Sequence, residues 1–257
     1  MIIILNIVFL QAERKENMTT KTQGIVLRTV KYSDKSSIAT VYTREFGRTS
    51  YMIYGISGKK SAVKSALFLP LTIIEINATY HPGKEIQQLK EVKIEFSIST
   101  LFGNPVKNAI ALFLTELLHK TLKRQEADEA VFDFTKKAIQ MMNELEEGIA
   151  NFHLIFMLKL TRYLGFEPNK ENAEANYFDL MNGVFQPEKP FHNHFLNKEL
   201  TRDFARLLHS DFLSMGTIHL SRTRRNDLLE GLIEYYRLHM PDFHGLHSVD
   251  VLHEIFT

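Results

Sequence analysis

The sequence contains no cysteine, which excludes a disulfide framework, a cysteine-ligated zinc or iron–sulfur site and a thiol nucleophile. It also lacks the phosphate-binding pattern G-x-x-x-x-G-K-[ST], the zinc-hydrolase pattern H-E-x-x-H and the nucleophile-elbow pattern G-x-S-x-G. His192 and His194 are two residues apart and would share one side of a strand, but the sequence offers no third metal ligand. We therefore expect neither an enzyme nor a metal or other cofactor.

Long apolar runs are also missing. The first ten residues, MIIILNIVFL, are apolar, but about 20 residues are needed to span a bilayer. No Lys or Arg precedes this run and no small-residue cleavage pattern follows it, so it does not read as a signal peptide. We interpret residues 1–17 as a mis-called start or a disordered extension, with Met18 as the working start. The alternative is a short anchor in the membrane interface.

What is present is ordinary in composition and uneven in charge. The 257 residues are 44% hydrophobic and 24% charged, which is typical of a globular protein of two domains. Residues 18–98 contain 12 Lys and Arg against 6 Asp and Glu, whereas residues 99–257 contain 17 against 22. A basic first part beside an acidic second part favours a polyanion-binding module joined to another domain, although chance could produce the same division.

Residues 18–98 show an apolar period near two in five runs rich in β-branched and aromatic residues. In the first run, Ile25 and Leu27 alternate with Val26 and Arg28, and later runs lie near 38–42, 51–55, 71–80 and 89–96. Turn sequences at 46–48 and 81–84 separate them, the latter with Pro-Gly placed for a type II turn. Five strands in about eighty residues predict a small closed barrel, with an SH3-like barrel as the structural competitor.

Residues 18–65 hold nine basic and two acidic residues, and the loop 55–65 contributes three lysines and two glycines without an acid. Such a loop can approach phosphates closely and neutralise them without reading bases. Aromatic residues interleave with these cations, as in single-strand binders, although each one alone is better explained as barrel core. The aromatic residues are Tyr32, Phe46, Tyr51 and Tyr54. The predicted DNA-binding residues are Lys21, Arg28, Lys31, Arg44, Arg48, Lys59, Lys60 and Lys64.

Residues 99–257 change to a helical period. Asn104-Pro105, Asn197 and Ser221 are placed to start helices, and Gly165 to end one. The run 149–164 is apolar nearly all round, which predicts a central buried helix. Residues 166–196 fit neither period and contain three of the seven prolines. We expect a helical domain over 99–257 with an irregular insert at 166–196.

Two groups of cations in this domain could bind an anionic partner. Arg222, Arg224 and Arg225 lie in the first turn of a predicted helix, where their charge opposes the helix dipole. Either an anionic partner or local acids such as Asp227 would balance them. Lys120, Lys123 and Arg124 lie near the end of another predicted helix, where they also satisfy the dipole.

Several short motifs occur in an order that resembles the RecO family of bacterial DNA repair and recombination mediators. They are GIVLR at 24–28, a Tyr-x-Asp-x-x-Ser run at 32–37, Gly47, the Gly/Lys loop, LGFEP at 164–168 and HSVDVL at 247–252. The resemblance implies an α+β protein with an N-terminal OB-fold barrel and a C-terminal helical domain. It implies a cytoplasmic, nucleoid-associated mediator that consumes no cofactor, binds single- and double-stranded DNA and anneals complementary strands.

The resemblance also implies protein partners. These are RecR, the acidic tail of single-strand binding protein and, indirectly, RecA. It assigns the DNA-binding role to Lys21, Arg28, Lys31, Lys59, Lys60 and Lys64, and the acidic tail would need an apolar slot with a cationic rim, at either group of cations named above. The alternative function is a protein adaptor whose basic barrel binds an acidic peptide instead of DNA.

The sequence departs from the family in one place. Many members have a four-cysteine zinc cluster shortly after the LGFEP-like segment, where this chain reads EANYFDLMNGVFQPEKPFH. We expect the turn around Gly183 to form without metal, held by packing of Tyr177, Phe178 and Phe185.

Overall fold

The computed structural model describes residues 19–55, 66–81, 83–98, 103–122 and 127–255. The chain divides into two compact units. One comprises the residues up to Ser97 together with 122–132, and the other comprises 98–121 and 133–257.

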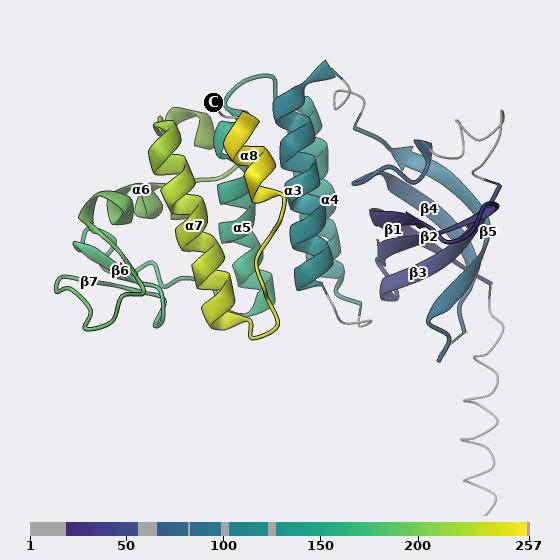
Figure 1. The fold of residues 1–257 in the computed structure, drawn as a ribbon, viewed down its shortest axis with the longest axis horizontal. Helices are drawn as coiled ribbons and strands as arrows, with labels where there is room; N and C mark the ends of the chain where they lie inside the picture. The colour runs from purple at the N-terminus through teal and green to yellow at the C-terminus, as the bar shows by residue number, and fades with distance from the viewer. Residues whose placement is uncertain (1–18, 56–65, 82, 99–102, 123–126, 256–257) are drawn as a thin grey trace, which may run out of the picture. The chain divides into compact units, whose positions relative to one another are not determined.

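The first unit is a closed five-stranded barrel with the strand order β1-β2-β3-β5-β4 (Figure 1). Its strands are β1 (Thr19–Lys31), β2 (Ser36–Thr43), β3 (Gly47–Tyr54), β4 (Ile73–Thr79) and β5 (Ile86–Phe96). The pairing of β3 with β5 is parallel and the other four pairings are antiparallel. The predicted five-stranded barrel of the OB type is confirmed.

Alternation explains most of the barrel core. In β3, Tyr51 and Ile53 are buried while Ser50 and Met52 between and beside them are partly exposed, as the period of two requires. The expected alternation in the first run is wrong, because Ile25, Val26 and Leu27 are all buried. The register of β1 against β2 shifts between Val26 and Arg28, and such a bulge reverses the faces to which the following side chains point.

The turn between β4 and β5 has the geometry that its sequence suggested. The Lys84 N–H donates to the His81 carbonyl oxygen at 3.2 Å, and Gly83 has a φ of 87°. A positive φ at the third position is what a type II turn demands and what glycine accepts without strain.

The second unit is built around helix α5 (Phe152–Leu164), which is buried along nearly its whole length and contacts α3, α6 and α7 (Figure 1). The other helices are α3 (Pro105–Thr121), α4 (Glu129–Glu144), α6 (Lys198–Leu208), α7 (Arg222–His239) and α8 (Val249–Ile255), with short 3₁₀ turns at Ile149–Asn151 and Met215–Thr217. Residues 129–132 of α4 belong to the first unit. The expected central buried helix is confirmed.

The predicted helix boundaries follow from caps. The side chain of Asn104 accepts from the Lys107 N–H at 3.1 Å, that of Asn197 from the N–H groups of the first turn of α6, and that of Ser221 from the Arg224 N–H. These bonds satisfy backbone donors that have no partner within the helix. Gly165 ends α5 with a φ of 86°, the left-handed conformation common at helix ends.

The insert at 166–196 contains a small antiparallel sheet in the order β7-β6-β8. Its strands are β6 (Tyr177–Asp179), β7 (Val184–Gln186) and β8 (Phe195–Leu196). The insert, which was expected to be irregular, thus contains a small sheet within a unit that is otherwise helical. Strands of two or three residues are too short to produce a readable alternation, which is why no strand was expected there.

Candidate nucleic-acid interface

The outer surface of the barrel carries two rows of side chains across β1, β2, β3 and β5. Cross-strand pairing builds the rows Arg28–Thr40–Ser50–Ile86 and Val30–Ile38–Met52–Gln88. All eight residues are exposed or partly exposed, and none is acidic. Because strands 2 and 3 form the face on which OB-folds bind oligonucleotides, this surface is the candidate nucleic-acid interface.

Cations and aromatic rings gather at one end of this face, which we call the β1–β2 end (residues 28–35 and Tyr54). All of residues 28–35 are exposed, including Arg28, Lys31 and Lys35. Tyr32 and Tyr54 each expose 65% of their surface. They lie at the same end, because the Tyr32 N–H donates to the Ser36 carbonyl oxygen and Ser36 pairs with Tyr54.

The electrostatics of the β1–β2 end favour an anion. Its one acid, Asp34, pairs with Lys31 at 3.0 Å, but both side chains are largely exposed, so this pair contributes little and can open. The Gly55 N–H donates to the Lys35 carbonyl oxygen at 3.1 Å. Gly55 is the last described residue before the loop that contains Lys59, Lys60 and Lys64, and these three lie outside the described residues.

Arg44 and Arg48 do not join this group. Thr43 pairs with Gly47 at the far end of the β2–β3 ladder and Ser36 with Tyr54 at the near end, which separates the two ends by about 23 Å at about 3.3 Å per residue. Arg44 pairs with Glu129 at 2.8 Å. Arg48 is partly buried, and this burial lowers its pKa below the ordinary value.

Lys21 also lies elsewhere. Its ammonium pairs with the Glu75 carboxylate at 2.7 Å. The two residues line a shallow groove of about 230 Å³ together with Glu91 and Lys93. Two cations face two carboxylates there, so the groove offers a polyanion no net attraction.

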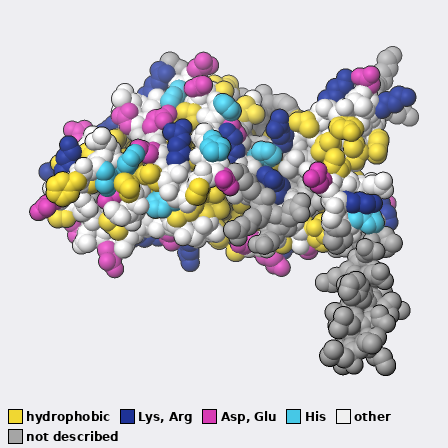
Figure 2. Space-filling view, turned by 60° about the horizontal axis from the view of Figure 1, so that its bottom comes forward, with side chains coloured by type: hydrophobic (Ala, Val, Ile, Leu, Met, Phe, Trp, Pro, Cys, Tyr) yellow, Lys and Arg dark blue, Asp and Glu magenta, His cyan; other side chains and the backbone are white. Residues whose placement is uncertain are grey.

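The four interleaved aromatic residues of the barrel differ in their exposure and in their packing. Tyr51 is 1% exposed and belongs to the core, where burial raises the pKa of its hydroxyl. Phe46 stacks on Tyr80 with ring centroids 4.3 Å apart. Tyr32 and Tyr54 remain for contact with a ligand. Figure 2 shows, on one face of the barrel unit, hydrophobic side chains gathered next to Lys and Arg side chains. The predicted site list omitted Lys35, although its position in the turn between the first two strands could have pointed to it.

The arginines at the start of α7 are held by their own unit. Arg224 pairs with Glu199 at 3.1 Å and with Asp203 at 3.2 Å, both on α6. Arg222 donates to the His253 carbonyl oxygen at 2.7 Å, and Arg225 to the Asn151 side chain at 3.1 Å. Local carboxylates therefore do balance this turn in part, but they come from α6 and not from Asp227.

Lys120, like these arginines, is bonded to residues of its own unit. Its ammonium pairs with Glu116 at 2.8 Å and donates to the Gly245 carbonyl oxygen at 2.6 Å. Lys123 and Arg124 lie outside the described residues. Among the described residues, the end of α3 therefore offers no cationic rim that could bind the acidic tail.

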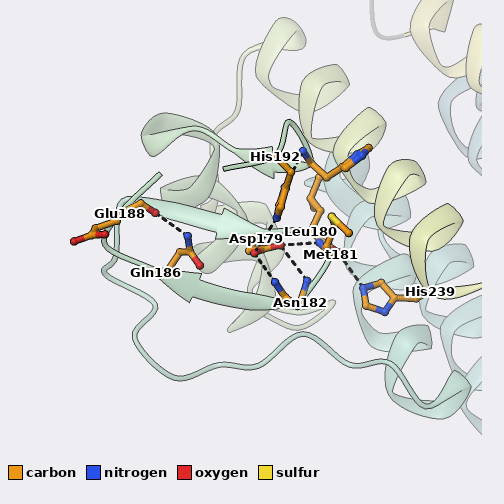
Figure 3. Close-up of polar contacts among 9 residues, drawn as sticks. Asp179, Leu180, Met181, Asn182, Gln186, Glu188, His192 and His239 are labelled. Carbon is orange, nitrogen blue, oxygen red and sulfur yellow. Dashed lines mark hydrogen bonds and ion pairs between the residues drawn. The ribbon is translucent and has the colours of Figure 1, made fainter. Parts of the chain in front are cut away.

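In the insert, a buried carboxylate organises the turn between β6 and β7 (Figure 3). Asp179 accepts from the N–H groups of Met181 and Asn182 at 2.9 and 3.0 Å, from the Asn182 side-chain amide at 2.7 Å, and pairs with His192 at 3.2 Å. Burial raises the pKa of Asp179, but these hydrogen bonds and His192 outweigh it, so the pKa lies below its ordinary value. Nearby, the His239 ring contacts the Leu180 carbonyl oxygen at 3.0 Å.

Aromatic packing completes the insert. The ring of Phe178 lies 4.8 Å from Phe185 and 4.4 Å from Phe204 of α6. Tyr177 packs edge-on against Phe195 instead. The expected packing of Phe178 with Phe185 is confirmed, whereas Tyr177 packs on the other side of the sheet because neighbouring strand residues face opposite ways.

The residues of the insert do not fit a zinc ion. His192 and His194 bond to different carboxylates, Asp179 and Glu234. Over the described part of the chain, no group of three or more His, Asp or Glu residues is arranged to hold a metal. Zinc needs four ligands in a structural site, and the observed order of this turn comes from the hydrogen bonds of Asp179.

Comparison with known proteins decides the family. Residues 18–98 match the model of the Recombination protein O N terminal domain, and residues 103–247 match that of the C terminal domain. This chain belongs to the RecO family. Among RecO relatives named DNA repair protein RecO, that of Phocaeicola vulgatus is 39% identical and that of Flavobacterium psychrophilum 37% identical, each over 93% of this chain and the whole of the relative. That of Bacteroides fragilis is 36% identical over the same shares.

RecO membership indicates a role in DNA repair and recombination. The N-terminal domain model covers the strands of the barrel, and the C-terminal domain model covers most of the helical unit. Within the described residues, no helix is both long enough and apolar enough to cross a membrane.

Proposed function

We propose that this chain is a non-enzymatic mediator of recombinational DNA repair that holds DNA by its barrel. The observation that carries the proposal is the β1–β2 end, where exposed Arg28, Lys31 and Lys35 share an outer face with two exposed tyrosines, and the rows of this face contain no acid. Cations there would neutralise phosphates, and the rings would stack on unpaired bases.

The wider activity rests on the RecO relatives. We propose that the chain binds single- and double-stranded DNA and promotes annealing of complementary strands. With RecR and the acidic tail of single-strand binding protein as partners, it would help RecA to load on coated single strands. It would act at the nucleoid in the cytoplasm and consume no cofactor.

The test is fluorescence anisotropy of labelled single-stranded DNA across a salt series. The variant Arg28→Gln/Lys31→Gln/Lys35→Gln should bind single-stranded DNA of any sequence more weakly than the unaltered chain does. Its slope of log K against log salt should be shallower by about 2, at about 0.7 per phosphate contact on single strands. The matched control is Lys84→Gln/Lys90→Gln/Lys93→Gln, which removes the same charge from exposed positions elsewhere on the barrel.

Two results would contradict the proposal. Equal slopes for the variant and the control would remove DNA contact from the β1–β2 end. Absence of DNA binding by the unaltered chain at low salt, together with binding of an acidic peptide, would establish the protein-adaptor function instead.

A further inference from the structure

Helix α6 carries a row of three cations on its outer face, followed by a histidine at its C-terminal end. Lys198, Arg202, Arg206 and His209 are all exposed, whereas Thr201, Phe204, Leu207 and Leu208 on the opposite face are buried. Spacings of four, four and three residues keep the four side chains on one face of a helix. At 1.5 Å per residue, successive members are about 6 Å or less apart along the axis. We call this row the α6 strip.

A groove of about 470 Å³ lies along the α6 strip, between the helix and the loop 173–176. Its apolar lining consists of alanine methyl groups, from Ala173, Ala175 and Ala205. Glu174 is the one carboxylate in the lining, against Lys198, Arg202 and Arg206. The loop is shaped by a turn at Asn172, which has a φ of 56° and whose carbonyl oxygen accepts from the Ala175 N–H at 2.9 Å.

The carboxylates of α6 are directed to other partners. Glu199 pairs with Arg224 of α7 at 3.1 Å. Asp203 is buried and pairs with the same arginine at 3.2 Å, while its contact with Arg206 is longer, at 3.6 Å. In the described part of the chain, no carboxylate lies within ion-pair distance of Lys198 or Arg202. The strip therefore keeps a net positive charge towards solvent.

We propose that the α6 strip is a second nucleic-acid site, which binds phosphate groups independently of base sequence. The proposal rests on the DNA binding proposed for this chain and adds a site outside the barrel. A row of cations at regular spacing suits a polymer of regularly spaced anions. The lining contains no Phe, Tyr or Trp, and its one ring is the imidazole of His209, so contact would be mainly to the backbone.

The groove is a poorer match for an acidic peptide. Peptide-binding sites draw most of their affinity from pockets that enclose a large apolar side chain. Alanine methyl groups on an open floor form no such pocket. The observations therefore favour nucleic-acid phosphates over the carboxylates of a protein partner.

The test is the variant Lys198→Gln/Arg202→Gln/Arg206→Gln in the full chain. Glutamine has a helix propensity close to that of lysine and arginine, so α6 should keep its fold, which circular dichroism and thermal unfolding would check. The matched control is Lys137→Gln/Arg162→Gln/Lys189→Gln, which removes three exposed cations of the same unit that are not in a row. The probe is a labelled mixed-sequence single strand of about 40 nucleotides, long enough for two sites, across a salt series.

We expect the salt slope of the α6 variant to be shallower by about 2 and its affinity at 0.1 M salt to fall by about 100-fold, at about 0.7 per lost contact. The control should change the slope by less than about 0.7, the value of one contact. A variant that equals its control overturns the α6 proposal, and so does a variant that loses binding of an acidic peptide while DNA binding is unchanged.

The barrel variant Arg28→Gln/Lys31→Gln/Lys35→Gln, measured in parallel, separates the two proposals. A loss in the barrel variant alone overturns the α6 strip and leaves the proposed function standing. A loss in the α6 variant alone supports the strip and removes the barrel site. Absence of DNA binding by the unaltered chain overturns both.

Discussion

Glu116 of α3 binds Ser248 at the start of α8 through both its backbone and its side chain. The carboxylate accepts from the Ser248 N–H at 2.8 Å and from its hydroxyl at 2.7 Å, and it also accepts from the His247 N–H at 3.0 Å. Lys120 pairs with the same carboxylate. Glu116 thus caps a helix that follows it by more than 120 residues and fastens the C-terminal segment to α3.

This contact makes stability depend on pH. Burial raises the pKa of Glu116, but Lys120 and the hydrogen bonds of His247 and Ser248 lower it more, to about 2. A group whose pKa is lower in the folded state stabilises the fold above its unfolded pKa, and this contribution is lost as pH falls. The loss should therefore occur between about pH 4.5 and pH 2.

The variant Glu116→Gln should lower the free energy of unfolding by about 1–2 kcal/mol at pH 7, because it removes a charged acceptor of several hydrogen bonds. The difference from the unaltered chain should shrink as the pH approaches 3. Urea unfolding at pH 7, 5 and 3.5 measures both effects, with exposed Glu146→Gln as control. A difference that does not change with pH would show that the charge of Glu116 is unimportant.

Gly24 opens the GIVLR motif at a position where the barrel is tightly packed. A Cβ atom there would lie 2.5 Å from Val41 Cγ1 and 3.2 Å from Ile76 Cδ1. We expect Gly24→Ala to lower the free energy of unfolding by about 1–3 kcal/mol through overpacking. Gly103→Ala is the control, since its Cβ would meet no atom within 4 Å.

The double variant Gly24→Ala/Val41→Ala tests the cause. Removing the Val41 methyl groups should recover part of the cost of the alanine at 24, so the two changes should not be additive. Additive losses of stability, measured by urea unfolding, would show that contact with Val41 is not the reason for glycine at this position.

The barrel was predictable from the sequence because alternation and turn residues are local signals. Gly83 and the cap of Asn104 behave as their neighbours in sequence suggested. The position of each cation was not predictable, because it depends on strand register. Arg28 pairs with Thr40 in the middle of the β1–β2 ladder, whereas Arg44 follows the pair of Gly24 with Thr43 at the end away from Lys31.

Ion pairs between residues far apart in the chain could not be predicted from the sequence either. Arg224 pairs with two carboxylates of α6, more than twenty residues earlier in the chain. From the sequence, nearby acids such as Asp227 were the expected partners. The role of Asp179 was missed for a similar reason, since a single aspartate between apolar residues gives no pattern. An aspartate four residues before a glycine in a turn could have indicated it.

Tyr32 and Tyr54 should contribute to single-strand affinity through their rings. Each alanine substitution should weaken binding by about 1–3 kcal/mol, which is roughly 5- to 150-fold, if the ring stacks on a base. Tyr32→Phe and Tyr54→Phe should bind nearly as the unaltered chain does, because the ring is kept. Affinity for single strands, measured by anisotropy, is the readout. Phenylalanine variants as weak as the alanine variants would assign the effect to the hydroxyl groups instead.

The lysines of the 55–65 loop give a prediction from sequence alone. Lys59→Gln/Lys60→Gln/Lys64→Gln should weaken binding to single strands and duplexes of any sequence and make the salt dependence shallower. The same anisotropy series, with Lys84→Gln/Lys90→Gln/Lys93→Gln as control, measures it. Unchanged affinity and slope would exclude these lysines from the DNA contact.

The insert should be stable without metal and should depend on Asp179 instead. Asp179→Ala leaves the N–H groups of Met181 and Asn182 without their acceptor, which should cost about 1–3 kcal/mol of unfolding free energy. Asp179→Asn keeps an acceptor and should cost less at pH 7. Because the pKa of Asp179 is lowered, its contribution should be lost as the pH falls below its ordinary range near 3.8.

Thermal unfolding with and without a chelator completes this test. The midpoint should be the same in both, because the described residues of the insert offer hydrogen bonds to Asp179 and aromatic packing around Phe178 but no set of zinc ligands. Added zinc should leave it unchanged as well, since only a metal that binds the folded state raises the midpoint. A fall in the midpoint on chelation, or a stoichiometric metal found by elemental analysis, would show that other side chains have replaced the missing cysteines as ligands.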